Sequence, residues 1–290
     1  MPHDRAALGA FLRSRRDRLT PSQAGIEAFP GARRVPGLRR EELAFLAGVS
    51  PDYYSRLEQG RQANISDQVL DALARALRLD AVECAHLRDL AAPTARRHAH
   101  APAVQRPDAG LLRLVGTLDH VPALLLGQRG DVLARNALLR AVLGRPLEPG
   151  TSFMRFLFQD PVARERIINW ADFASAAIAT LRRESGRRPH DLALLALVDE
   201  LRAADDDVAR WWHDHTVRDY ASVAKRIHHP TVGTLSFDIE IVVSPHERDQ
   251  RLVVYTVEPD SQTARLLPIL ADWDVDAFPS VEPGTSNSQP

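Results

Sequence analysis

Cysteine and lysine are almost missing from this sequence. Its single cysteine, Cys84, excludes a disulfide within the chain and is typical of a protein from a reducing compartment. Cys84 lies in an alanine-rich helical stretch, which favours a core position over a redox sensor. Lys225 is the only lysine, so nearly all of the positive charge is carried by arginine.

Long apolar runs are also missing. None approaches the ~20 residues that a membrane-spanning helix needs, and the first residues, Met-Pro-His-Asp-Arg, lack the apolar region of a signal peptide. We therefore expect a cytoplasmic protein that does not enter a membrane. The chain has 290 residues, 44% hydrophobic and 26% charged, which is sufficient for two domains with cores of their own.

The net charge of −1 gives no indication of a nucleic-acid partner, but the charges are unevenly distributed. Residues 5–61 contain eleven arginines and six acidic residues, so this part of the chain carries a surplus of five positive charges. A basic region of this kind is typical of a DNA-binding domain.

The stretch from Gly37 to Gly60 predicts two short helices that meet at a sharp turn. Apolar residues recur at helical spacing in the first helix, and Gly48 ends it because glycine accepts a positive φ. Ser50 caps the second helix, and Pro51 takes its first position, where no amide hydrogen is needed. In a helix-turn-helix, the N-terminal half of this second helix enters the DNA major groove. Its outward side chains are Pro51, Asp52, Tyr53 and Arg56.

This stretch resembles the helix-turn-helix of the Cro and phage-repressor type, also called XRE. The matching positions are Glu42-Leu43-Ala44, Ala47-Gly48-Val49-Ser50 and Tyr54-Ser55-Arg56-Leu57-Glu58-Gln59-Gly60. The resemblance implies that an arginine of the preceding helix pairs with Glu58. The alternative is a helical hairpin with only a structural role.

Three further helices are predicted around the helix-turn-helix, which gives five helices in a first domain of residues 1–92. They are Ala6 to Arg18, a helix that begins at Ser66, and Ala81 to Ala91. Thr20 to Gly37 contains prolines and glycines and predicts a loop, whose Arg33 and Arg34 either reach phosphates or lie in a solvated segment. Residues 93–108 predict an exposed linker.

Residues 109–275 predict a second domain with both helices and strands, followed by a disordered tail, residues 276–290. Strands flank the turn Gly127 to Asp131 as a hairpin, and three more strands follow late in the domain. Those three are Val217 to His228, Val232 to Val243 and Arg251 to Glu258. The predicted helices are Leu111 to Leu118, Asn136 to Leu143, Thr151 to Phe158, Pro161 to Glu184, His190 to Ala203, Asp206 to His213 and Ser261 to Leu270.

The whole chain resembles the MmyB-like transcription regulators of actinobacteria and related bacteria. The resemblance rests on Arg33 to Leu43, Tyr53 to Arg61, Val69 to Leu77, Asp131 to Asn136, Trp211 to Val217 and His229 to Gly233. It implies an all-α, repressor-like domain followed by an α+β, PAS-like domain with an antiparallel sheet, which binds a fatty acid or similar lipid. It also implies that the protein is not an enzyme and needs no other cofactor. One departure is Arg135, where the family often has tryptophan.

On the DNA side, the resemblance aligns Pro51, Asp52 and Arg56 with base-reading positions and Arg40 with a phosphate contact. Arg56 can bind guanine with two hydrogen bonds, and Asp52 can accept from cytosine. A single module contacts few base pairs, so we expect a homodimer on a palindromic operator. The full set of predicted DNA-binding residues is Arg33, Arg34, Arg40, Ser50, Pro51, Asp52, Tyr53, Arg56 and Arg61.

On the sensor side, aromatic residues can line an apolar pocket, or they can simply fill the core. A lipid site also needs polar groups for the head group. The aromatic candidates are Phe153, Phe156, Phe158, Trp170, Phe173, Trp211, Trp212, Phe237 and Tyr255. The polar candidates are Arg135, Asn136, His215, Lys225 and Arg226.

Two rival interpretations of the second domain stay open. In one, the domain serves only for dimerisation. In the other, His213, His215, His228 and His229 form a cupin-like metal site of a sensor or an enzyme. The spacing of these histidines does not place them on one face, and no glutamate follows at cupin spacing, so no metal site is predicted. A nucleophile elbow and a phosphate-binding glycine loop are also missing.

Overall fold

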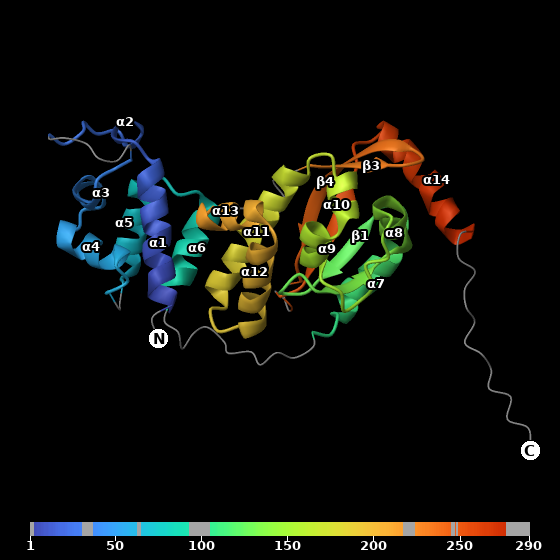
Figure 1. Ribbon diagram of the computed structural model, residues 1–290, viewed down its shortest axis with the longest axis horizontal. Helices are drawn as coiled ribbons and strands as arrows, with labels where there is room; N and C mark the ends of the chain where they lie inside the picture. Colours follow the sequence, from blue (N-terminus) through green and yellow to red (C-terminus); the bar gives the residue numbers. More distant parts are fainter. Residues whose placement is uncertain are drawn as a thin grey trace, which may run out of the picture. The chain divides into compact units, whose positions relative to one another are not determined.

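The computed structural model describes residues 3–30, 37–62, 65–92, 105–216, 224–244, 247 and 249–276. The chain forms two compact units, each made of two segments (Figure 1). Unit 1 comprises Met1–Val104 and Ala171–Ser222, and unit 2 comprises Gln105–Trp170 and Val223–Pro290. None of the described helices is long and apolar enough to cross a membrane. The helices within residues 171–222 thus belong to the same compact unit as the N-terminal helices, whereas the sequence predicts them in the second domain.

Unit 1 is entirely helical in its described residues. Its N-terminal helices are α1 (His3–Arg18), α2 (Pro21–Ala24), α3 (Arg40–Ala47), α4 (Pro51–Glu58), α5 (Asp67–Ala76) and α6 (Ala81–Ala91). Its later helices are α11 (Trp170–Arg187), α12 (Leu192–Ala204) and α13 (Asp206–His213). The short helix α2 is a sixth N-terminal helix, where the sequence predicts only a loop. Thr20 caps α2 and Pro21 opens it, which explains why a helical turn forms there.

The N-terminal helices share one apolar core. Its centre is formed by Leu12 of α1, Leu43 of α3, Tyr54 of α4 and Leu73 of α5, all fully buried. Apolar side chains at helical spacing on each helix meet there, so the core holds the angle between α3 and α4.

Unit 2 contains a five-stranded antiparallel sheet with helices, which confirms the predicted fold class of a helical domain followed by a helix-plus-sheet domain. Its strands are β1 (Ala123–Leu126), β2 (Val132–Arg135), β3 (Lys225–His229), β4 (Gly233–Val242) and β5 (Arg251–Thr256). Its helices are α7 (Ala109–Thr117), α8 (Ala137–Leu143), α9 (Phe153–Gln159), α10 (Pro161–Arg166) and α14 (Gln262–Asp276). The strand order is β2-β1-β5-β4-β3.

The pleat of β4 gives the sheet one buried face. Leu235, Phe237 and Ile239 are buried, while the residues between them are exposed. Lys225 of β3 lies opposite Phe237, and Ile239 lies opposite Tyr255 of β5. The only lysine of the chain therefore points into the core of unit 2.

The predicted helix from Pro161 to Glu184 is wrong, because the chain breaks it into α10 and α11. Residues 167–169 instead run along β3, the last strand of the sheet. Ile167 pairs with Ile227, and Ile168 donates its amide to the carbonyl of Arg226 at 2.9 Å. The helical periodicity of the sequence continues across this point, so only the pairing with a distant strand reveals the break.

The opposite edge of the sheet is covered in the same way. The amide of Val132 in β2 donates to the carbonyl of Thr151, and the amide of Gly150 donates to the carbonyl of Val132, both at 2.8 Å. The backbone of residues 150–151 therefore lies along the outer side of β2.

Three predicted boundaries differ from the structure. Residues 105–108, expected to end an exposed linker, are bound to unit 2, where Gln250 donates to the carbonyl of Arg106 at 2.7 Å. The strand expected from Val217 begins at Lys225 within the described residues. Helix α14 continues past the predicted Leu270 to Asp276. The expected tail beyond Asp276 lies outside the described residues.

Candidate functional site

The helix-turn-helix forms at the predicted residues. Gly48 follows α3 with a φ of 66°, in the left-handed region that favours glycine. Val49 then donates its amide to the carbonyl of Ala44. The Ser50 hydroxyl accepts a hydrogen bond from the Tyr53 amide at 3.1 Å, and α4 begins at Pro51. The change of direction is thus complete within residues 48–50.

One face of α4 is buried and the other is open to solvent. Tyr54 and Leu57 lie in the core, whereas Pro51, Asp52 and Arg56 are exposed. The Arg56 guanidinium lies 6.0 Å from the centre of the half-buried Tyr53 ring. An arginine and an aspartate on the exposed face of such a helix supply a donor pair for guanine and an acceptor for cytosine. Of the four residues predicted to point outward, Pro51, Asp52 and Arg56 are exposed, and Tyr53 is half-buried against the core.

A buried carboxylate fixes the position of α4. The side chain of Glu58 is fully buried and accepts hydrogen bonds from Arg16 Nε at 2.6 Å and Arg40 Nε at 2.7 Å. Burial alone raises the pKa of Glu58, but the two guanidinium groups outweigh this effect and hold the pKa below its usual range. The arginine–glutamate pair implied by the resemblance is formed by Arg16. Glu58 thereby joins α1, α3 and α4.

Gly9 allows the backbones of α1 and α4 to touch. A Cβ atom at this position would lie 2.2 Å from the carbonyl oxygen of Glu58, a distance that no side chain can accommodate without displacing a helix. Helix α4 is therefore held to α1 both by the Arg16–Glu58 pair and by direct backbone contact.

The other predicted DNA-binding residues lie around α4 or outside the described chain. The Arg40 side chain is 46% exposed although its Nε binds Glu58, so part of it is accessible to a phosphate. Arg61, shortly after α4, is exposed. Arg33 and Arg34 lie outside the described residues.

Six of the aromatic candidates lie in the interior of unit 2. They are Phe153, Phe156, Phe158, Trp170, Phe237 and Tyr255, all of them buried. The ring centres of Phe153 and Phe156 lie 5.9 Å apart, and those of Phe237 and Tyr255 lie 5.6 Å apart. Phe153, Phe156, Phe237 and Tyr255 form an aromatic cluster at the buried face of the sheet, where the side chain of Lys225 connects the two pairs.

Lys225 lies within this aromatic cluster. It is fully buried, its Nζ donates to the Tyr255 hydroxyl at 3.1 Å, and the same Nζ is 5.4 Å from the ring centre of Phe153. Burial lowers the pKa of Lys225 to about 7. An ammonium group among aromatic rings is suited to the carboxylate of an otherwise apolar ligand. Its neighbour Arg226 is exposed.

The contacts of Arg135 and Asn136 favour a structural role for both. Asn136 uses its amide oxygen to accept from two backbone amides and its amide nitrogen to donate to two carbonyls. These backbone groups belong to Leu118, Val121, Ala123 and Leu139. Arg135 donates to the carbonyl of Pro146 at 2.6 Å and to Glu148 at 2.7 Å. Both side chains hold the β1–β2 hairpin to its surroundings.

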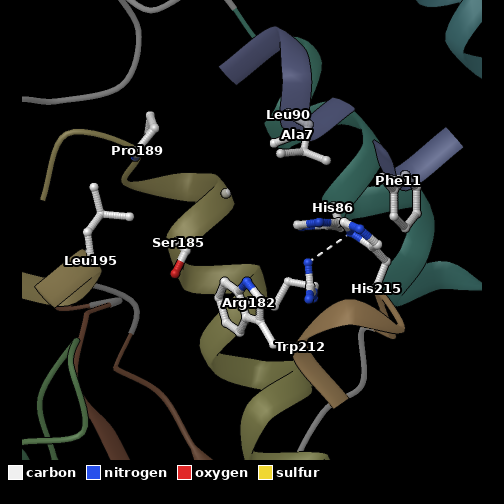
Figure 2. A pocket seen from close by; sticks show the side chains of 11 residues that line it. Ala7, Phe11, His86, Leu90, Arg182, Ser185, Pro189, Leu195, Trp212 and His215 are labelled. Atoms are coloured by element: carbon white, nitrogen blue, oxygen red, sulfur yellow. Dashed lines mark hydrogen bonds between the residues drawn. The ribbon is translucent and has the colours of Figure 1, made fainter. Parts of the chain in front are cut away.

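The remaining predicted ligand residues belong to unit 1; they are Phe173, Trp211, Trp212 and His215. Trp212 and His215 line a cavity of about 290 Å³ whose wall also includes Phe11 of α1 and Leu90 of α6 (Figure 2). Phe173 is buried in α11 and does not line this cavity. The residues expected to line a single pocket therefore lie in two different units.

Two polar residues of this cavity, Arg182 and His86, are missing from the sequence prediction. Arg182 Nη1 lies 2.9 Å from His215 Nδ1, and its guanidinium lies 4.3 Å from the ring centre of Trp212. Arginine only donates, so Nδ1 of His215 accepts and this histidine is neutral. Burial, followed by the charge of Arg182, lowers the pKa of His215 to about 4. One feature of the sequence could have identified Arg182. It lies four residues after Ile178, so a helix places it on the same alanine-rich face as this buried residue.

The histidines considered as metal ligands form no such site in the part of the chain that the structure describes. The rings of His213 and His215 are 6.4 Å apart. No group of three or more side chains of the metal-binding types lies together among the described residues.

Comparison with protein families gives two matches that together span most of the chain. Residues 107–270, more than half of the 290 residues, match the MmyB-like transcription regulator ligand binding domain. Residues 7–87 match a helix-turn-helix domain. No curated protein matches the chain. The first match runs from the end of the expected linker into α14, so it includes helices of unit 1 as well as the sheet of unit 2.

Proposed function

Because the chain belongs to the MmyB-like transcription regulators, we propose that it binds a palindromic operator as a homodimer and that a fatty acid changes its operator affinity. The helix-turn-helix provides DNA binding and the second matched domain provides ligand binding. The observation that carries the proposal is the open face of α4. Its proposed base-reading side chains are exposed, while the buried Glu58 anchors the helix to Arg16 of α1.

Losing a base contact and losing a phosphate contact change the DNA affinity in different ways. Arg56→Ala is expected to remove about 1–3 kcal/mol of discrimination at one base pair, because the paired donors for guanine are lost. Arg40→Ala is expected to weaken all sequences alike and to reduce the salt dependence by about one phosphate contact. Gel-shift titrations of an operator and its single-base variants at several salt concentrations measure both effects.

Arg75→Ala is the matched control for these two variants, because Arg75 is an exposed arginine of α5 outside the helix-turn-helix. It should leave both base preference and salt dependence unchanged. A uniform loss of affinity in both Arg56→Ala and Arg40→Ala would contradict the assigned roles.

The homodimer follows from the small contact area of one module. A single α4 reaches few base pairs, and two copies related by a two-fold axis read two half-sites about one helical turn apart. The symmetry of the protein then requires a palindromic operator.

The fatty acid is assigned to the aromatic interior of unit 2. Lys225 supplies a cation for the carboxylate, and Phe153, Phe237 and Tyr255 supply apolar surroundings for the chain. The strand order β2-β1-β5-β4-β3 supports the PAS-like classification of the sensor. Dimerisation without any ligand is the alternative, and it predicts an aromatic interior that only fills space.

Native mass spectrometry tests both the assembly and the ligand. The purified protein is expected at twice the mass of one chain, with an added mass of fatty-acid size that is released on denaturation. A dimer without added mass, even after incubation with fatty acid, would favour the dimerisation-only alternative. A chain that stays monomeric at micromolar concentration, with and without operator, would contradict the homodimer.

A further inference from the structure

The cavity of unit 1 has the character of a ligand site. Its volume of about 290 Å³ is at the lower end of the range for small-molecule pockets. Phe11, Leu90, Leu195 and Trp212 make most of its wall apolar. Figure 2 shows Arg182, His86 and His215 together at one end of this apolar space, with Leu195 and Pro189 toward the other. A polar end and an apolar body are thus both present.

Arg182 has hydrogen-bond donors that lack an acceptor. Its side chain is buried, with 7% exposure of the residue; its guanidinium lies against the ring of Trp212, and within the part of the chain that the structure describes Nη1 is the atom with a hydrogen-bond partner, His215. Among the described residues, Nε and Nη2 are buried and have no hydrogen-bond partner. Buried donors, above all charged ones, are almost always paired. Nε and Nη2 also form the side of the guanidinium that matches the two oxygens of a carboxylate.

The charges around Arg182 favour an anion at this place. Burial, with the charges of Arg15 and Arg202, lowers the pKa of Arg182 to about 9, so it remains charged at neutral pH. Arg15 is already paired with Glu83 at 3.0 Å. His86 is neutral because burial lowers its pKa to about 3, and its Nδ1 is buried without a partner among the described residues.

We propose that this cavity binds an apolar small molecule that carries a carboxylate, with the carboxylate on Nε and Nη2 of Arg182. The apolar part lies against Phe11, Leu90 and Leu195. The site is separate from Lys225, and its part in regulation rests on the proposed function. An apolar acid therefore has two places on each chain, one in each unit.

Helix α1 connects this site to the recognition helix. One face of α1 contributes Phe11 to the cavity, and Arg15 donates to the carbonyl of His215 at 2.6 Å. Another face carries Arg16, which binds Glu58 at the end of α4. A ligand that changes the position of α1 also changes α4, since Gly9 keeps the two backbones in contact. Occupation of the cavity is thereby coupled to operator affinity.

The binding test titrates decanoate and decanol into the full chain by calorimetry. The two probes share their chain length, and only decanoate is charged. The forms compared are the unaltered protein, Arg182→Met, Lys225→Met and the control Arg187→Met. Arg187 lies on the same helix, is 36% exposed at its side chain and does not line the cavity. Thermal unfolding of each form checks that it is folded.

The expected results separate the two sites. The unaltered protein and Arg187→Met bind decanoate at two sites. In Arg182→Met, the decanoate affinity of one of these sites falls at least ten-fold. Lys225→Met retains the Arg182 site, where decanol binds at least ten-fold more weakly than decanoate. If Arg182→Met binds decanoate as the unaltered protein does, the inference is overturned. If Lys225→Met loses decanoate binding in the same experiment, the fatty-acid site of the proposed function is still supported. Equal binding of both probes to Lys225→Met also overturns it, whether or not Arg182→Met folds.

The coupling test repeats the gel shift with decanoate present. Decanoate should change the operator affinity of Lys225→Met and leave that of Arg182→Met unchanged. An affinity of Lys225→Met that does not respond to decanoate, although decanoate binds, overturns the coupling through α1. If no form binds decanoate, both the Arg182 site and the assignment of a fatty acid to unit 2 are overturned. The DNA-binding part of the proposed function is then tested separately by operator binding.

Discussion

Replacing Glu58 with glutamine is expected to lower the free energy of unfolding of the N-terminal helices by about 3–5 kcal/mol. The substitution keeps the volume but removes the charge that the buried Arg16 and the half-exposed Arg40 share. Arg16 then keeps Asp17 and the carbonyl of Leu38 as partners, but its buried Nε faces a neutral amide oxygen in place of a carboxylate, so less of its desolvation is compensated. Urea unfolding followed by circular dichroism measures the loss, and operator binding should fall with it because α4 loses its anchor.

The same carboxylate predicts a pH dependence with a definite sign. The pKa of Glu58 is lower in the folded protein than in the unfolded chain, where it is about 4.3. Its contribution to stability is therefore complete above that unfolded value and is lost as the pH falls through the folded value. Glu58→Gln lacks this contribution at every pH, so the difference between the two proteins should shrink on acidification.

Glu41→Gln is the control for this prediction. Glu41 is the neighbour of Arg40 on α3, its side chain is 52% exposed, and it lies 3.4 Å from Arg39. An exposed pair of this kind contributes about 0–1 kcal/mol. Similar losses in Glu41→Gln and Glu58→Gln, or a difference that grows at low pH, would contradict the role given to Glu58.

Removing Lys225 is expected to stabilise unit 2. Burial lowers its pKa from 10.5 to about 7, and each unit of such a shift corresponds to ~1.4 kcal/mol. The double variant Lys225→Met with Tyr255→Phe removes the ammonium and the hydroxyl that accepts its hydrogen bond, so no buried partner of that bond is left behind. At pH 7 it should unfold with a free energy up to about 4 kcal/mol higher.

The gain from this double variant should disappear as the pH rises. A lysine with a lowered pKa takes up a proton on unfolding, so the unaltered protein becomes more stable between pH 7 and about pH 10, where the unfolded lysine also loses its proton. Arg226→Met is the control, because Arg226 is the exposed neighbour on β3. A gain that is constant with pH, or equal in Arg226→Met, would show that the charge of Lys225 is not its cause. Stability should increase while fatty-acid binding decreases.

The helix-turn-helix could be predicted because its signals are local. Gly48, Ser50 and Pro51 determine the turn by their own backbone preferences, and the helical spacing of Tyr54 and Leu57 determines which side chains point outward. None of these properties depends on residues distant in the sequence. The Arg16–Glu58 pair, which joins residues far apart, required the family resemblance.

The sensor side could be predicted only in part, because its decisive contacts join distant segments. The cavity of unit 1 takes Phe11, His86 and Arg182 from three separate helices and His215 from the turn after α13, and no spacing in the sequence connects them. The position of α11 in the same unit as the N-terminal helices could not be predicted for the same reason, because it depends on contacts between distant segments. Most of the candidate aromatic residues are buried, whereas Trp211 and Trp212 are half-buried. Periodicity could not distinguish a residue that fills a core from one that lines a cavity.

Both outer edges of the sheet in unit 2 are covered by backbone that is not itself part of a strand, residues 167–169 beside β3 and residues 150–151 beside β2. An uncovered edge offers free amide and carbonyl groups that can recruit a strand from another molecule and begin aggregation. Here the two segments block that route at Val132 of β2 and at Arg226 and Ile227 of β3. Local opening of either segment would expose more of the edge and make the sheet more prone to aggregate.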